Sequence, residues 1–159
     1  MLTQEIVLHP TNRPPVAFQG RTVAEAVGPL LGGRHHEITV YETETGELHL
    51  VFKYLTQCER EKSQCEVELA IEADESQEIL LAYDASECLD RRELRTHYRY
   101  EQDFNRFIKR IYSQYDDLCI SIEEQLRGYQ PSVVTAPRSN VADNYKPSGW
   151  KSWIGFRPR

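Results

Sequence analysis

The stretch that decides the fold is residues 37–55, EITVYETETGELHLVFKYL. Its apolar residues alternate with other residues: Ile38 and Val40 come first, followed by Leu48, Leu50, Phe52 and Tyr54. A period of two indicates half-buried β-strands, here residues 37–43 and 47–55. Between them, Glu44-Thr45-Gly46 fits a three-residue hairpin loop with glycine at the position that needs a positive φ. The segment therefore predicts a β-hairpin.

A third strand is expected at residues 65–73, CEVELAIEA, with its apolar row on one face and glutamates on the other. This pattern predicts an antiparallel meander with one dry face and one face in water. Pairing Lys53 with Glu68 keeps both apolar rows on the same side, and we prefer this register. A shift of two residues would instead oppose Cys58 to Cys65 and suit a disulfide, so the redox state of these two cysteines stays open.

The segments before this meander predict one more strand and a short helix. Residues 4–8 read as a strand, and the prolines that follow favour extended chain. Thr22 and Glu25 have capping-box spacing, which predicts a helix that ends at Gly32-Gly33.

Helices are expected after the meander. Residues 74–84 favour a helix because Asp74 can cap it, although Ile79-Leu80-Leu81 could form a strand. No proline or glycine interrupts residues 91–127, where apolar residues recur at spacings of three and four. We expect this apolar stripe to pack on the sheet. A homodimer seam along helix 101–127 is the alternative.

These elements predict an α+β fold. A small antiparallel β-meander is covered on one face by helices, including one long amphipathic C-terminal helix, and an irregular tail follows. We expect a single domain over residues 1–128. Residues 129–159 form a linker and a basic, aromatic C-terminal tail.

Composition and charge narrow the class of protein. The chain has 159 residues, of which 40% are apolar and 28% charged, which excludes collagenous and wholly disordered proteins. Its net charge of −6 divides into −10 over residues 1–127 and +4 over residues 128–159. An acidic body repels phosphate backbones, whereas a basic tail attracts anionic partners.

The sequence gives no sign of a membrane span, a signal peptide or a cofactor. It has no apolar run of 18 residues and no basic, apolar leader at Met1, so we expect a cytoplasmic protein without a transmembrane segment. The four cysteines lack metal-ligand spacing, and we expect free thiols, no metal and no cofactor. The common nucleotide, zincin, hydrolase and calcium motifs are also missing.

The candidates for catalysis are a cluster that contains His35 and His36, and the single residue His49. Arg34-His35-His36-Glu37 is a dense polar cluster, but neighbours on an extended segment point to opposite faces. His49 would form an acid/base pair if it opposed Glu72 on the solvent-exposed face. A hydrolase centred on His35 and His36 is accordingly our third hypothesis, and we lean towards a non-enzymatic protein.

Basic residues supply the candidate binding sites. Arg91, Arg92, Arg95 and Arg99 are candidates for binding an anion, since three of them recur every four residues on a helix. The tail ends in WKSWIGFRPR. We expect its large and cationic side chains to bind a partner: Trp150, Lys151, Trp153, Ile154, Phe156, Arg157 and Arg159.

Two functions follow from these basic residues. The first is a regulatory or accessory subunit that docks to a larger protein assembly through the tail. The second is a nucleic-acid-associated factor that uses the Arg91/Arg95/Arg99 stripe and the tail. The tail could alternatively fold back on its own domain or contact a membrane surface.

Overall fold

A computed structural model describes residues 3–131 of the protein. Its sheet has five antiparallel strands in the order β1-β2-β3-β4-β5. The strands are β1 (Gln4–Leu8), β2 (Val16–Val27), β3 (Arg34–Thr43), β4 (Leu48–Thr56) and β5 (Gln64–Ala70). The helices are α1 (Ala73–Ala82), α2 (Arg91–His97) and α3 (Glu101–Leu126). The fold is thus α+β, as predicted.

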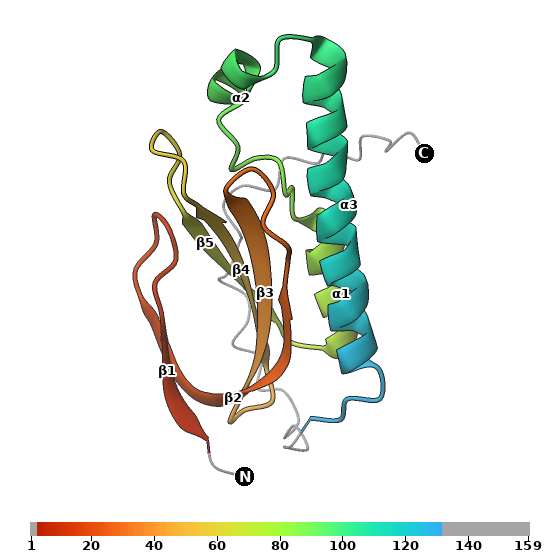
Figure 1. Ribbon diagram of the computed structural model, residues 1–159. Helices are drawn as coiled ribbons and strands as arrows, with labels where there is room; N and C mark the ends of the chain where they lie inside the picture. The colour runs from red at the N-terminus through yellow and green to blue at the C-terminus, as the bar shows by residue number, and fades with distance from the viewer. Residues whose placement is uncertain (1–2, 132–159) are drawn as a thin grey trace.

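Helices α1 and α3 lie on one side of a curled sheet, and α2 lies beyond one end of it (Figure 1). The main core between the two layers is formed by β2, β3 and β4 together with the apolar stripe of α3. Seven residues of α3 are buried: Phe104, Phe107, Ile111, Tyr115, Leu118, Cys119 and Ile122. The stripe therefore packs on the protein's own sheet, and it is not free to form a dimer seam along helix 101–127.

The prediction of a helix from Thr22 to Gly32 is wrong, because residues 16–27 form the long strand β2. The capping-box spacing is a local signal, and pairing with a strand on each side overrides it. Gly32 and Gly33 have φ values of 57° and 78°, in a two-residue turn closed by hydrogen bonds between Leu31 and Arg34. The two glycines therefore form a type I′ hairpin turn rather than the predicted helix end.

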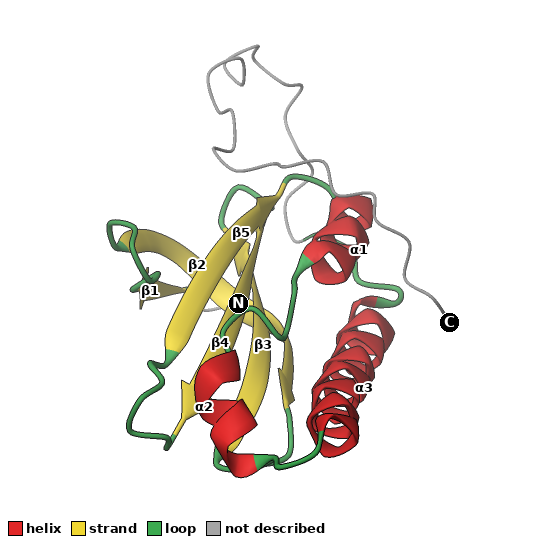
Figure 2. Cartoon of the chain, turned by 90° about the horizontal axis from the view of Figure 1, so that it is seen from above, coloured by secondary structure: helices red, strands yellow, loops and turns green. Residues whose placement is uncertain are grey.

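The opposite face of the sheet is partly covered by the chain itself, whereas the prediction left it in water. Strand β1 and the first half of β2 curl over it, on the side away from the helices (Figure 2). Ile6 and Leu8 pack there against Val51 and Val67 in a second, smaller core. A bulge between Thr22 and Ala24 makes this possible, because one extra residue switches the side-chain alternation of β2 from one face to the other.

The predicted register between β4 and β5 is also wrong. Lys53 lies opposite Cys65 rather than Glu68, and Val51 lies opposite Val67. Because of this shift of three residues, the apolar row of β4 faces the main core, whereas Val67 of β5 faces the opposite side of the sheet. There Val67 is buried in the second core. A single surface charge pair is too weak to outweigh that burial.

The remaining elements agree with the prediction except in detail. The hairpin loop ends at Gly46 with a φ of 84°, and α1 begins at a capping box between Glu72 and Glu75. The predicted helical stretch 91–127 is broken between His97 and Glu101, which separates α2 from α3. The boundary between domain and tail at residue 128 stays a prediction, although Tyr129 packs against the main core.

Candidate functional site

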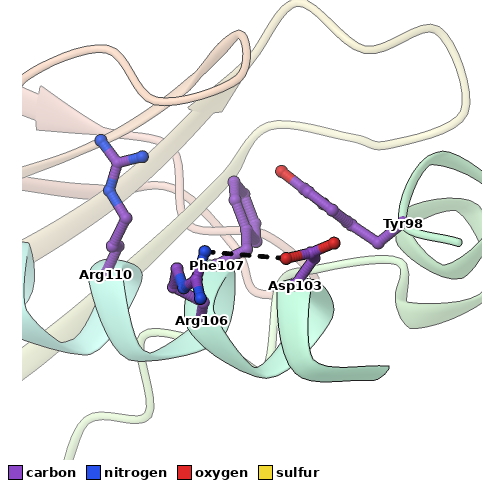
Figure 3. A pocket seen from close by; sticks show the side chains of 5 residues that line it. All are labelled: Tyr98, Asp103, Arg106, Phe107 and Arg110. Atoms are coloured by element: carbon purple, nitrogen blue, oxygen red, sulfur yellow. Dashed lines mark ion pairs between the residues drawn. The ribbon is translucent and has the colours of Figure 1, made fainter. Parts of the chain in front are cut away.

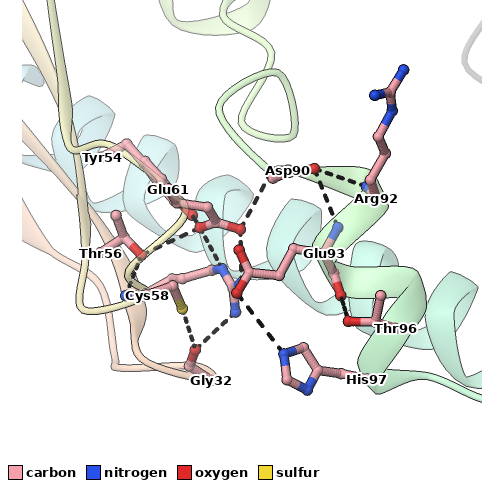
Figure 4. A network of polar contacts seen from close by, with 11 residues as sticks. Gly32, Tyr54, Thr56, Cys58, Glu61, Asp90, Arg92, Glu93, Thr96 and His97 are labelled. Atoms are coloured by element: carbon pink, nitrogen blue, oxygen red, sulfur yellow. Dashed lines mark hydrogen bonds and ion pairs between the residues drawn. The ribbon is translucent and has the colours of Figure 1, made fainter.

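A buried ion pair lies where the β2–β3 turn, the β4–β5 loop and α2 meet (Figure 4). The Arg34 guanidinium donates to both carboxylate oxygens of Glu61 at 2.7 Å and to the Gly32 carbonyl oxygen at 2.8 Å. The Tyr54 hydroxyl and the Asp90 backbone N–H also donate to Glu61. Arg34 is 5% exposed and Glu61 8% exposed.

The electrostatics of this cluster favour its charged form. The hydrogen bond to Glu61 raises the pKa of Arg34 above its usual value despite burial. Burial by itself raises the pKa of Glu61, but hydrogen bonds from Arg34 and Tyr54 outweigh it and lower the pKa below the usual value. The cluster therefore holds three segments together, and its donors and acceptors are occupied by one another. The sequence indicated Arg34 as part of a polar cluster, but nothing marked Glu61 as its partner.

The two histidines of β3 do not converge. The imidazole of His36 is 6% exposed and lies among the rings of Tyr54, Tyr83 and Tyr115. Burial lowers the pKa of His36 to about 4, so it is neutral at neutral pH. His35 lies on the other face, 3.2 Å from a Glu37 carboxylate oxygen. The structure thus separates the pair on which a hydrolase would depend.

His49 does not oppose Glu72 as the predicted acid/base pair required. It lies opposite Tyr41 and Leu69, and its ring stacks on Phe18 at 4.4 Å between centroids. Burial lowers its pKa below the usual value. The ring is therefore a packing element under the curled first half of β2.

The four arginines predicted to bind an anion lie in α2 or just after it. Arg91 donates to the Ser86 hydroxyl at 3.3 Å, and the Arg95 guanidinium lies 5.2 Å from the centre of the Phe104 ring. Arg92 and Arg99 are exposed, and Arg99 follows the end of the helix. The predicted stripe is therefore only one turn long, from Arg91 to Arg95.

Helix α3 adds three exposed cations that the sequence analysis overlooked: Arg106, Lys109 and Arg110. They lie in the second and third turns of α3, whose N-terminal end is beside α2 (Figure 1). Residues 91–110, which we name the basic pole, carry seven basic and three acidic residues, a net charge of +4. The rest of residues 3–131 carries seven basic and 21 acidic residues, a net charge of −14. The spacing of Arg106 and Arg110 by one helical turn was a signal that could have found them.

A shallow pocket of about 230 Å³ opens within the basic pole (Figure 3). Its lining residues come from the end of α2 and the first half of α3: Tyr98, Asp103, Arg106, Phe107 and Arg110. It combines two aromatic rings, two cations and one carboxylate. Its two guanidinium groups could donate to an anionic group.

The predicted binding residues of the tail lie outside the described residues. These are Trp150, Lys151, Trp153, Ile154, Phe156, Arg157 and Arg159. Cys58, Cys65, Cys88 and Cys119 are free cysteines. Within residues 3–131, no three His, Cys, Asp or Glu side chains are grouped so that they could hold a metal ion. None of α1, α2 and α3 combines the length and apolar character that crossing a bilayer requires.

Comparison of the chain with protein-family models, curated proteins and solved structures gave no match.

Proposed function

We propose that this chain is a non-enzymatic accessory protein that docks onto an acidic surface of a larger protein assembly. It does so through the basic pole and the C-terminal tail. The observation that carries this proposal is the separation of charge in the folded part, +4 over residues 91–110 against −14 over the remainder. Such a distribution orients the molecule towards an anionic partner and speeds their encounter.

The tail supplies the second contact in this proposal. Its segment 150–159 contains two tryptophans, a phenylalanine and three cations, which are residue types that dominate binding hot spots. Charge from the pole would set orientation, and the rings would supply buried apolar area. We place the protein in the cytoplasm, where its four free thiols would stay reduced.

A protein partner is favoured over a nucleic acid because of the acidic remainder. A charge of −14 next to the pole repels the extended phosphate backbone of a nucleic acid, but it does not oppose a local acidic patch on a protein. The exposed ring of Tyr100 beside Arg99 favours the second candidate, in which the pole and tail bind single-stranded nucleic acid by stacking. The affinity for a nucleic acid must fall steeply as the salt concentration rises. An affinity that does not change with salt concentration excludes this second candidate.

A comparative pull-down tests the leading proposal. Three baits are compared: the full chain, a chain without residues 145–159, and the variant R92E/R99E, which reverses two charges in the basic pole. R13E/R127E is the matched control, since both of its arginines are exposed and lie outside the pole. We expect a partner that is retained by the wild type and by the control, and lost from the other two. Equal recovery of that partner by all four proteins would refute the proposal.

A further inference from the structure

The pocket in the basic pole has an aromatic floor. Phe107 is 5% exposed, and its ring lies 5.3 Å from the half-buried ring of Tyr98 between centroids, tilted by 34°. Tyr98 directly follows α2 and Phe107 lies in α3, so the break between the two helices brings the rings together. Figure 3 shows these rings together with the polar side chains that line it.

Two arginines of this pocket have donors to spare. Arg106 and Arg110 are exposed and one turn apart on α3. The Arg106 guanidinium is 3.7 Å from an Asp103 carboxylate oxygen, a loose pair whose side chains are 75% and 46% exposed. No hydrogen bond or ion pair holds the Arg110 guanidinium within residues 3–131. A surface pair of this kind is worth little and leaves most of the five N–H donors of each guanidinium free.

We propose that this pocket binds the carboxylate of one acidic side chain from a partner protein, with an adjacent apolar side chain resting on the Tyr98 and Phe107 rings. Arg106 and Arg110 donate to the carboxylate. This inference rests on the proposed function, because it names the chemistry by which the basic pole recognises its partner.

The size and charge of the pocket favour a peptide carboxylate over other anions. Its volume of about 230 Å³ is below the roughly 300 to 1,000 Å³ of typical small-molecule sites, and it suits the two neighbouring side chains of a peptide. Two arginines and Asp103 give the lining a net charge of +1. That charge matches a carboxylate monoanion, whereas a phosphate group near pH 7 carries up to two negative charges.

Fluorescence anisotropy with the full chain tests this assignment. The probe is a short fluorescein-labelled peptide of alternating leucine and glutamate, and its control has glutamine in place of glutamate. We expect R106Q and R110Q each to weaken binding about tenfold, as loss of one charge-assisted hydrogen bond does. The matched control is K109Q, which removes an exposed cation between these arginines but outside the pocket lining, and it should weaken binding less than about twofold.

A second variant separates the aromatic floor from the charge. Y98A should weaken binding of the leucine–glutamate peptide but not of a peptide in which glycine replaces leucine. Circular dichroism of Y98A checks that the fold is intact, because Tyr98 packs against the main core.

The possible results distinguish failure of the pocket assignment from failure of the proposed function. If K109Q and R92Q weaken binding as much as R106Q and R110Q, the attraction is spread over the pole. The pocket assignment then fails while the proposed function stands. If inorganic phosphate displaces the peptide better than acetate at equal ionic strength, the site prefers phosphate and the carboxylate assignment is wrong. If neither peptide binds and the pull-down also finds no partner that depends on the pole, both proposals fail.

Discussion

Replacing Glu61 with glutamine should destabilise this protein more than most single substitutions. One Glu61 carboxylate oxygen accepts from Arg34 Nη2 and the Asp90 N–H, and the other accepts from Arg34 Nε and the Tyr54 and Thr56 hydroxyls. Glutamine keeps one carbonyl oxygen and presents an amide N–H₂ to the other set of donors. Whichever way the amide turns, at least two donors lose their acceptor, and Arg34 stays buried without its counter-charge.

The expected loss can be worked from these contacts. A buried donor without an acceptor costs about 1 to 3 kcal/mol, and removing one partner of a buried ion pair costs about 3 to 5 kcal/mol. Because the two hydroxyls can rotate to accept from the amide, we expect about 3 kcal/mol for E61Q. For a protein of this size, that corresponds to a fall in melting temperature of the order of 10 °C.

Urea unfolding followed by far-UV circular dichroism measures the difference, because this signal follows the helices and strands of the described residues. The matched control is E68Q, the same substitution at a pair with Arg13 that is 3.9 Å long and about half exposed. It should cost less than about 1 kcal/mol. If E61Q is no less stable than E68Q, the buried pair does not hold the three segments together and the reasoning is wrong.

Three further predictions concern the main core. The pKa of His36 is about 4 in the folded protein and about 6.5 when unfolded, so the unfolded chain takes up the proton first as pH falls. The unfolding free energy should drop by about 3 kcal/mol from pH 6.5 to pH 4, and a urea series at several pH values should show a flatter profile for H36F; an unchanged profile would contradict this. Y115F removes a buried hydroxyl that donates to the Leu80 carbonyl oxygen at 2.6 Å, and should cost about 1 to 3 kcal/mol in urea unfolding; no loss would mean that this hydrogen bond does not stabilise the fold. I111A deletes a side chain that is 2% exposed and should cost about 2 to 5 kcal/mol by the same assay, whereas I120A, on the exposed side of α3, should cost far less; equal losses would mean that α3 does not pack on the sheet as described.

The strands of the hairpin and the apolar stripe of α3 could be predicted because their patterns are local and repeat. Ile38, Leu50 and Phe52 alternate with a period of two, and Phe104, Ile111 and Tyr115 recur at helical spacing. β2 could not be predicted in this way. Its capping-box spacing is as local as those patterns, yet hydrogen bonding to β1 and β3 outweighs it.

The candidate site was predicted only in part. The arginines of α2 stood out by their density, but the break at residues 98–100 was missed, because no proline or glycine marks it. That break brings Tyr98 beside Phe107 and turns a row of cations into a pocket.

The sequence by itself determined the α+β class, the hairpin turn at Gly46 and the face that α3 buries, because each depends on residues that are neighbours in the chain. Only the tertiary structure decided the pairing of Arg34 with Glu61, the burial of His36 and the second core under β1. Those features depend on contacts between segments that are far apart in the sequence. The free energy gained when these segments bury one another cannot be inferred from any one segment alone.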